Sequence, residues 1–534
     1  MVSSRTMASS SSKSAEDYEP STSTMELDWE ETGRKMNELS IFDKGYNSEE
    51  NPNHRVLNVF NPRDLSSFSA MIHIDVPDTK QLANRTAGQP NFTAYNIVIN
   101  GWHHGSVRYS HLYELAELVS KKFGIKYKGP DFPPRRLFRL GTTDIEERRQ
   151  KIAKYFEALI QHPDITRHQL IEKKFLEFQV ESFRPTSSVA NLDIFLGNGE
   201  KIQIKCNISD STNDILQYIG ETLKCHKPDH FQWYFGLFLA RGRDYQSSNY
   251  SITTDNFNPL IVRFLKNFEA PYISLTTTNH KSSADGHHHF LCLRKLVWSP
   301  SVEASLLFNA AMTDLFYRQA VHEYKLGFMD PVKHRHTLED ALISGDAGQE
   351  WFLRNCHKEP HYGYERLSDC ISDYPVDGTA CRIKIGQRQL VLSYTDDTGA
   401  PVDKSFRVTR IRIWRLTKVA DRIMFQFQFL MDQDTFKWIT LDTDQAILIS
   451  LILQSIGSEV LSEHSNMTLE DQIMKEKTKK GIIEKKGGLL RGRMSLSCAV
   501  DGPMDPLGVK DAIPPSQPAY LNGSTDDDIT NDDL

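Results

Sequence analysis

The stretch Val107–Gln150 constrains this chain most, because it sets basic side chains beside the predicted starts of two helices. Trp102–Tyr109 has the pattern of a strand, and Ser110 opens an amphipathic helix that stops at Gly124. Arg108 therefore stands where a strand runs into a helix N-terminus. The free N–H groups and the helix dipole at such an end favour a bound anion.

A second predicted helix carries an arginine on its core-facing side. Thr143 and Glu146 form a capping box that starts this helix, and Arg148 falls on its apolar stripe. A guanidinium there needs a partner, and for a lone arginine an internal carboxylate or a snorkelling side chain is the simpler explanation. Arg108 and Arg135, the latter in a proline-rich loop, add two further cations. Three cations around two helix starts favour a phosphate site.

Length and composition indicate a multidomain protein whose thiols are reduced. The 534 residues correspond to about three to four domains. No apolar run approaches the roughly 20 residues that span a bilayer, and the Ser/Thr-rich N-terminus lacks the apolar segment of a signal peptide. The 7 cysteines are odd in number and irregularly spaced, which argues for free thiols in the cytosol. Consecutive histidines at His287–His289 cannot share one face, so we expect a solvated loop and no metal site there.

The predicted elements begin after a polar extension. Residues 1–70 have few apolar clusters, and we expect them to be disordered. Three strands followed by helices occupy residues 71–183. Between the helices, Gly124–Pro130 carries Ile125 and Tyr127 beside two lysines. Such a loop either dips into a membrane interface or packs its two apolar side chains in the ordinary way, and the sequence supports both interpretations equally.

Three further lobes are predicted in the second half of the chain. A hairpin, a helix and more strands give residues 190–280 a ubiquitin-like pattern, and residues 286–375 have a helical pattern. Several strands and a closing helix predict a PTB/PH-like half-open barrel over 376–462. Residues 463–534 are expected to be a disordered tail with an acidic end.

One tryptophan stands out in the predicted barrel. Alternation along its strand places Ile411 and Ile413 on one face, and Arg410, Arg412 and Trp414 on the other. Trp414 either stacks on its arginines as packing or floors a groove where a peptide adds as a strand to the sheet edge. The closing helix is apolar nearly all round, so it must cover the barrel and meet a second surface, for which the neighbouring lobe is the simplest candidate.

No catalytic set is recognisable in the sequence. There is no Gly-rich phosphate loop of the P-loop or kinase type, no Cys-x5-Arg spacing of a tyrosine phosphatase, and no Gly-x-Ser-x-Gly context. We therefore expect a binding protein that is not an enzyme and that needs no cofactor and no metal.

The Arg-Tyr-Ser triplet, the proline-rich loop and the helix arginine together resemble the PX family of phosphoinositide-binding domains. The resemblance implies that Arg108 holds the 3-phosphate, Tyr109 stacks on the inositol ring and Ser110 bonds to phosphate. Arg135 stands where a lysine is commoner in the family, which keeps the charge and alters the geometry. Arg148 would grip ring hydroxyls.

The order of units resembles the PX–FERM sorting nexin family from Met71 to about Val460, and again at the extreme C-terminus. The implied fold class is α+β multidomain. A PX domain, made of a three-stranded antiparallel sheet plus helices, precedes a FERM-like module of ubiquitin-like, helical and PTB/PH-like lobes. The residues that carry the resemblance are Tyr95-Asn96-Ile97, Val107-Arg108-Tyr109-Ser110, Tyr234-Phe235, Leu237-Phe238-Leu239, Tyr362-Gly363-Tyr364, Phe406-Arg407-Val408-Thr409-Arg410 and Gln445-Ala446-Ile447.

The family implies an endosomal cargo adaptor on the cytosolic face of early endosomes. It would bind membranes that contain phosphatidylinositol 3-phosphate and return transmembrane cargo to the plasma membrane. Its third lobe would bind Asn-Pro-x-Tyr-type motifs in receptor tails through Trp414, Leu430, Leu453 and Ile456. The position after Ile456 is apolar in the family and is Gly457 here, which removes contact area from the groove. We expect a monomer and no nucleic-acid partner.

The C-terminal tail splits by charge. Lys475–Arg493 is basic, which usually means a solvated segment and can add weak attraction to an anionic membrane. The end of the chain is acidic, which generally means solubility alone. The resemblance instead implies docking to the Commander/Retriever complex through Ile529, Asp532, Asp533 and Leu534. The rival function is a FERM-type linker between membrane and cytoskeleton, which would co-sediment with actin and capture no retrieval complex.

Overall fold

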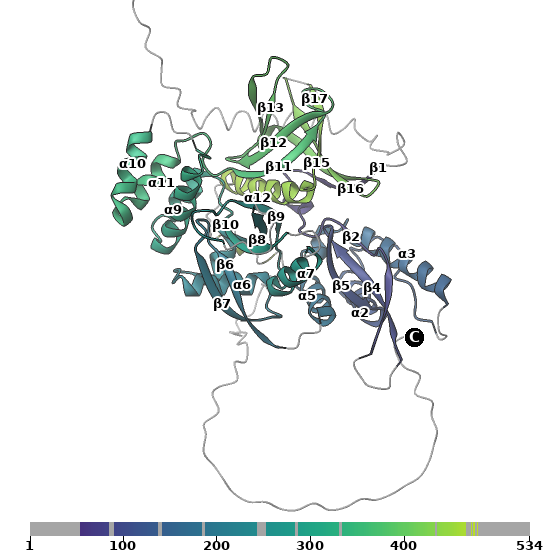
Figure 1. The fold of residues 1–534 in the computed structure, drawn as a ribbon. Coiled ribbons are helices and arrows are strands. Elements are labelled where there is room, and N and C mark those ends of the chain that lie inside the picture. Colours follow the sequence, from purple (N-terminus) through teal and green to yellow (C-terminus); the bar gives the residue numbers. More distant parts are fainter. Residues whose placement is uncertain are drawn as a thin grey trace, which may run out of the picture.

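The structure is a computed structural model that describes residues 54–84, 90–136, 141–183, 187–242, 252–282, 287–329, 334–432 and 435–465, with residues 471, 474, 475 and 478. Its elements form an N-terminal unit (74–183), a first lobe (189–295), a second lobe (300–356) and a third lobe (365–464). Figure 1 shows the third lobe at the top, the second lobe at the left and the N-terminal unit at the lower right, with helix α12 beneath the third lobe's sheet.

The N-terminal unit is an antiparallel sheet with helices packed against it. The sheet has the order β2-β4-β3, and β5 pairs with β4. The predicted start of its second long helix is wrong, because Glu146 pairs with Arg149 and Asp144 instead accepts the N–H of the cap residue Gly141, at 3.3 Å. The elements are β2 (Ile74–Asp75), β3 (Thr79–Leu82), β4 (Phe92–Ile99), β5 (Trp102–Arg108), α2 (Tyr109–Phe123), α3 (Thr142–Leu159), α4 (Pro163–Thr166) and α5 (Gln169–Phe183).

The first lobe is a five-stranded sheet of order β7-β6-β10-β8-β9. Its central strand β10 (His289–Lys295) pairs with β6 in parallel and with β8 in antiparallel fashion. The predicted boundary at residue 280 is therefore too early, and the predicted solvated loop is wrong for His289, which is 5% exposed. The other elements are β6 (Val189–Phe195), β7 (Lys201–Asn207), α6 (Thr212–Thr222), η2 (Pro228–Trp233), β8 (Phe235–Gly242), β9 (Pro259–Phe264) and α7 (Pro271–Ser282).

The second lobe is helical and lies within the range predicted to be helical. Its helix α9 begins after Asn309, whose side chain accepts hydrogen bonds from the N–H groups of Ala311 and Met312. The elements are α8 (Pro300–Leu306), α9 (Ala310–Lys325), α10 (Arg335–Ile343), η4 (Gly345–Gly348) and α11 (Gln349–Cys356).

The third lobe is an eight-stranded antiparallel sheet packed on one long helix, α12 (Ala446–His464). The strand order is β1-β15-β16-β17-β11-β12-β13-β14. Its other elements are β11 (Glu365–Ser372), β12 (Thr379–Gly386), β13 (Gln389–Thr395), β14 (Pro401–Arg407), η5 (Val408–Arg410), β15 (Ile411–Val419), β16 (Arg422–Leu430) and β17 (Phe436–Asp442).

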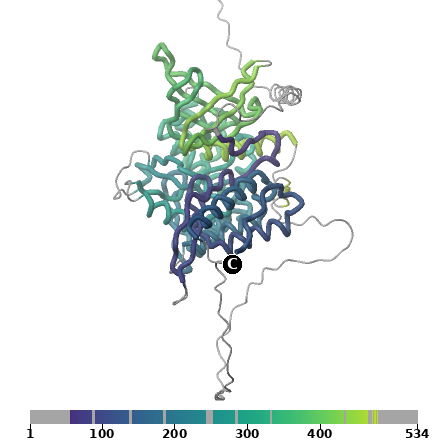
Figure 2. The backbone as a smooth tube through the Cα atoms, turned by 90° about the vertical axis from the view of Figure 1, so that its right-hand side faces the viewer, coloured from purple at the N-terminus to yellow at the C-terminus, as the bar shows by residue number. Residues whose placement is uncertain are grey.

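The outermost strand of this sheet comes from the N-terminal extension. β1 (His54–Phe60) pairs with β15, and the short helix η1 (Leu65–Ser67) follows it. The prediction of disorder through residue 70 is therefore wrong from His54 onward. Leu57 and Phe60 are buried at 3% and 1% exposure in the core of the third lobe, which supplies the apolar partners that the extension lacks by itself. Figure 2 shows this purple segment close to the yellow-green helix.

Helix α12 is a core helix. Its 19 residues are long and apolar enough to cross a membrane, contrary to the prediction that no segment approaches that length. However, 67% of the segment is buried inside the protein. One flank packs on the third lobe's sheet, and Glu459 accepts hydrogen bonds from the backbone of Trp298 and Ser299, at 2.9 and 2.6 Å, between the first and second lobes. Burial against two surfaces explains why the helix is apolar nearly all round.

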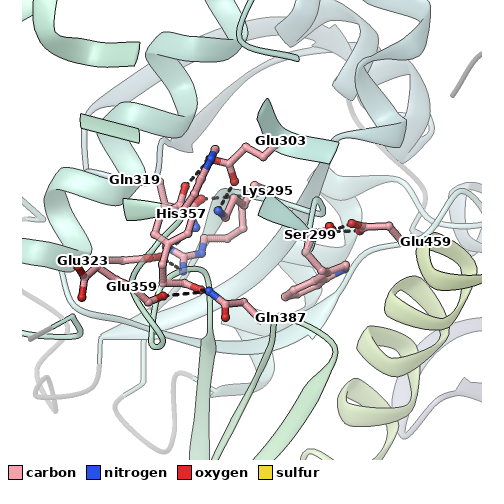
Figure 3. Close-up of polar contacts among 12 residues, drawn as sticks. Lys295, Ser299, Glu303, Gln319, Glu323, His357, Glu359, Gln387 and Glu459 are labelled. Atoms are coloured by element: carbon pink, nitrogen blue, oxygen red, sulfur yellow. Dashed lines mark hydrogen bonds and ion pairs between the residues drawn. The ribbon is translucent and has the colours of Figure 1, made fainter. Parts of the chain in front are cut away.

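Buried polar contacts join the three lobes (Figure 3), and Arg294 of the first lobe pairs with Glu323 of the second and Glu365 of the third. Lys295, at the end of β10, lies 2.5 Å from the carboxylate of Glu303 in α8, which also accepts a hydrogen bond from Tyr362. Although burial raises the pKa of Glu303, Lys295 and His357 hold it at about 2, so the carboxylate is charged. Each charge therefore depends on its partner inside the protein.

Candidate lipid and peptide sites

The predicted lipid site lies where β5 ends and α2 begins. Arg108 is the N-cap residue of α2, and an arginine offers no acceptor to the N–H groups of the first turn. Its side chain donates to Asn84 Oδ1 at 3.0 Å and lies over Phe92, 3.5 Å from the ring centroid. Ser110 follows in the first turn and is partly exposed. A bound anion can supply the acceptor that this helix end lacks in its cap residue.

Tyr109 and Arg148 are stacked in the interior of the site. The Arg148 guanidinium carbon lies 4.2 Å from the centroid of the Tyr109 ring. Tyr109 is only 2% exposed and donates its hydroxyl to the carbonyl of Pro133 at 2.6 Å, while burial raises its pKa to about 12. The ring is thus covered, so in this arrangement it forms a floor under Arg148, and the predicted stack on an inositol ring is not open to it.

The remaining predicted lipid residue joins the same aromatic group. Arg135 is exposed and lies over Tyr113, 4.5 Å from the ring centroid. The rings of Tyr113 and Tyr109 are 6.0 Å apart, so Arg135 and Arg148 stand over neighbouring aromatic faces. The structure therefore brings these predicted cations together around one aromatic cluster, with Arg108 at the adjoining helix start.

The loop Gly124–Pro130 lies between α2 and α3, and the sequence left open whether its two apolar side chains enter a membrane or pack in the protein. The structure gives a different answer for each side chain. Ile125 is 98% exposed. Tyr127 is instead partly buried, packs on Tyr155 with ring centroids 5.2 Å apart, and donates to the carbonyl of Pro130. Tyr127 is therefore an ordinary packed side chain, and Ile125 alone is free to enter a membrane interface.

The predicted peptide site has a different geometry from the one that alternation suggested. A register shift between Ile411 and Ile413 interrupts the pairing of β15 with β16. As a result, Ile411 and Trp414 both face the core, and Trp414 is 0% exposed. The indole Nε1 donates to Ser450 Oγ of α12 at 2.9 Å. The prediction that Trp414 shares a face with its arginines is therefore wrong.

The other predicted peptide contacts separate into two groups. Leu453 and Ile456 of α12 are 0% exposed and belong to the same hydrophobic cluster as Trp414. Leu430 is 4% exposed at the end of β16 and is not a member of that cluster. We call the region between the β15 edge and α12, around Trp414, Leu453 and Ile456, the peptide site. Phe60 and Phe68 of the N-terminal segment cover it.

Family models match three stretches of the chain: the PX domain at residues 95–179, the sorting nexin 17/27/31 FERM F1 lobe at 190–298, and the sorting nexin 17 FERM C-terminal domain at 363–461. Sorting nexin-17 of Danio rerio is 28% identical over 423 residues, covering 76% of this chain and 85% of the relative. Human sorting nexin-17 is 29% identical over 418 residues, covering 75% and 84%. Human sorting nexin-31 is 26% identical over 417 residues, covering 75% and 89%.

The chain belongs to the PX–FERM sorting nexins. Its N-terminal unit is the PX domain, and its three lobes form the FERM-like module. The match to the first lobe runs to residue 298, which agrees with the position of β10 in that lobe's sheet. The predicted fold class, a PX domain followed by FERM-like lobes, is confirmed.

Two further predictions for this sorting nexin concern its C-terminal docking residues and metal binding. Ile529, Asp532, Asp533 and Leu534 lie outside the residues that the structure describes. Within the described parts of the chain, no group of three or more His, Cys, Asp or Glu side chains is placed to hold a metal ion.

Sequence reasoning missed two residues of the peptide site, Phe60 and Phe68, and named Gly457 only as a loss of contact area. Phe60 stacks on Trp414 with ring centroids 5.6 Å apart, and Phe68 lies 5.9 Å from the same ring. Gly457 packs beneath Phe68. A signal was present, because the short apolar run before Asn61 ends in an Asn-Pro turn sequence, which is typical of a strand followed by a turn.

Proposed function

We propose that this sorting nexin is an endosomal cargo adaptor that binds phosphatidylinositol 3-phosphate through its PX domain and Asn-Pro-x-Tyr-type motifs through its third lobe. Sorting nexin homology supports the coarser role of an endosomal sorting adaptor. The adaptor holds two weak contacts at one membrane, so tethering by lipid raises the effective concentration of receptor tails.

The observation that carries the lipid assignment is the state of Arg148. Its side chain is 5% exposed, and Nη2 makes no hydrogen bond to any part of the chain that the structure describes. A buried cation without a hydrogen-bonded anion is unfavourable, and a phosphate or ring hydroxyl offers the missing acceptor. Arg108 and Arg135 add charge around the same aromatic cluster, and exposed Ile125 offers an apolar contact with the membrane.

The test is co-sedimentation with phosphatidylcholine vesicles with and without phosphatidylinositol 3-phosphate. Arg148→Gln removes the charge, and we expect about tenfold weaker binding or more, from the loss of charged hydrogen bonds. Lys151→Gln is the matched control, because Lys151 lies on the same helix and pairs with Glu147 at the exposed surface. Equal binding by wild type and Arg148→Gln would contradict the lipid site.

The peptide assignment rests on β15, which lies beside α12 and would form the edge of the third lobe's sheet if β1 were displaced from it. The acidic C-terminus is proposed to bind Retriever through Leu534, with Ile529 as a second anchor. A pull-down that compares the intact protein with one lacking only Leu534 tests this. We expect loss of Retriever subunits with vesicle binding unchanged, whereas equal capture by both proteins would exclude Leu534 as the connector.

A further inference from the structure

The peptide site is occupied by the chain's own N-terminal segment. β1 pairs antiparallel with β15, from His54 opposite Val419 to Phe60 opposite Trp414. β1 is the last strand on that side of the sheet, so without it β15 would present an open edge. An added strand is the way in which a peptide binds to such an edge. Figure 1 shows β1 beside β15.

The side chains of this segment enter the site as those of a bound peptide would. Leu57 and Phe60 are buried, whereas Val56 and Val59 are 36% and 47% exposed. Phe60 stacks on Trp414 at 5.6 Å, with an angle of 19° between the rings. A register shift between Val56 and Asn58 interrupts the alternation, so the segment buries Leu57, Asn58 and Phe60 and leaves Val56 and Val59 to solvent.

A tight turn follows the strand. The N–H of Asp64 donates to the carbonyl of Asn61 at 3.0 Å, and the N–H of Arg63 donates to Asn61 Oδ1 at 2.9 Å. Pro62 fits the second position of such a turn because its ring fixes φ. The Arg63 guanidinium then donates to the carbonyl of Thr409 at 2.8 Å, so the turn is held against the third lobe.

Gly457 of α12 is fitted to this segment. A Cβ added at Gly457 would lie 3.2 Å from Phe68 Cζ and 3.5 Å from the carbonyl oxygen of Pro62. A larger apolar side chain there would displace the Phe68 ring. Glycine is unfavourable in a helix interior, and here it makes room for an aromatic side chain of the segment. The contact area that the glycine removes from the site is thus supplied by Phe68.

We propose that residues 54–68 are an intramolecular ligand of the peptide site, which a receptor tail must displace; this rests on the proposed cargo-binding function. The ligand class that the site takes is a peptide with an apolar strand, an Asn-Pro turn and aromatic anchors. The fourth residue of the segment's turn is Asp64, which is exposed and accepts a hydrogen bond from the N–H of Ser66. An Asn-Pro-x-Tyr peptide carries an aromatic ring at that position, so it has one contact that the chain's own segment lacks.

Covalent attachment makes the segment a strong competitor. A ligand on a short tether acts at an effective concentration of about millimolar, and the apparent affinity for an added peptide falls by the fraction of molecules whose site is open. The segment is also anchored outside the third lobe, since Gln161 donates to the carbonyl of Leu57 at 2.8 Å and Arg167 to that of Leu65 at 2.9 Å. The alternative is that the segment is a permanent strap, meaning that it links the PX domain to the third lobe and is never displaced by a peptide. The experiment must distinguish this from a displaceable ligand.

The experiment titrates two fluorescent synthetic peptides, residues 54–68 of this chain and an Asn-Pro-x-Tyr peptide, into the full-length protein. The variant is Phe60→Ala with Phe68→Ala, and the control is Val59→Ala, whose side chain lies on the open face of the same strand. Removing the buried ring of Phe60 and the partly buried ring of Phe68 should raise the open fraction on the order of a hundredfold, and peptide binding should tighten by at least about tenfold. Val59→Ala should bind as the wild type does.

Binding of both peptides by the folded double variant at wild-type affinity would overturn the inference and leave a permanent strap. If the double variant does not fold, hydrogen exchange of the wild type decides. Excess Asn-Pro-x-Tyr peptide should remove the protection of the β1 amides, and retained protection in a complex with that peptide would refute displacement while leaving the proposed cargo function standing. Conversely, tighter capture of the 54–68 peptide by the double variant, with no binding of Asn-Pro-x-Tyr, supports the intramolecular ligand and refutes the cargo class.

Discussion

Trp414→Ala is expected to destabilise the third lobe, which a surface contact would not do. The side chain is 0% exposed, stacks on Phe60 and donates to Ser450 Oγ. Truncation of a buried tryptophan or phenylalanine to alanine lowers the free energy of unfolding by about 3–5 kcal/mol. The loss of the hydrogen bond lowers it by about 1 kcal/mol more. We therefore expect a loss of about 5 kcal/mol in the free energy of unfolding of this lobe.

The assay is urea unfolding followed by hydrogen exchange of β15 and β16 amides, which reports on the third lobe alone. Trp351→Ala is the matched control, because Trp351 is 44% exposed on α11. It should change stability by less than about 0.5 kcal/mol. A Trp414→Ala variant as stable as Trp351→Ala would refute the buried placement. If the loss is as expected, weaker cargo binding by Trp414→Ala reports unfolding as much as contact, and Phe60→Ala is the cleaner probe of the site.

Two further predictions concern buried charges. Lys295→Met should destabilise the protein by about 3–5 kcal/mol, because it removes the ammonium group that pairs with the buried Glu303 carboxylate. Adding Glu303→Leu should recover part of that loss. Additive effects of the two substitutions in a double-mutant cycle would contradict the pairing. Burial raises the pKa of Glu459 from 4.5 to about 7. The folded state then keeps a proton that the unfolded state releases, so this contribution is full below pH 4.5 and lost as pH rises to about 7, by up to about 3 kcal/mol. Thermal unfolding of Glu459→Gln should lack this decline, and an unchanged pH dependence would contradict it.

Features with a local cause were predictable from sequence. Apolar spacing located α2 and placed Arg148 on the buried stripe of α3, where it is 5% exposed. Charge and helix ends then indicated an anion site, because both act within one turn of a helix. Spacing did not predict the order of stacking inside the site, where Arg148 covers Tyr109, since that depends also on the ring of Phe132, which comes from the loop between α2 and α3.

Features with a distant cause were not predictable. The sequence predicts the wrong face of the sheet for Trp414, because one irregular residue in β15 shifts the alternation of side chains. A bulge of this kind cannot be recognised from the sequence pattern of a single strand. β1 falls in the stretch that the sequence predicts to be disordered, because its apolar residues are too few to form a core. Its partner strand β15 lies far along the chain, with His54 opposite Val419 and Phe60 opposite Trp414. Composition indicates how much apolar surface a segment can bury by itself. It does not reveal the hydrogen-bond and apolar partners that a strand far along the chain provides.

The glycine in α12 and the strand in the extension have a joint consequence for how lipid and cargo binding are related. The segment that fills the peptide site also donates from Asn58 to the carbonyl of Ile72 at 2.6 Å and accepts from Gln161 of the PX domain. A receptor tail that displaces the segment must therefore break contacts with the PX domain as well as with the third lobe. Linkage is reciprocal, so if release of the segment alters the affinity for lipid, lipid must alter the affinity for the tail by the same factor. The affinity of the wild type for an Asn-Pro-x-Tyr peptide should then differ between measurements with and without phosphatidylinositol 3-phosphate vesicles. The difference should be smaller in the Phe60→Ala, Phe68→Ala variant, in which the segment is already released from the peptide site.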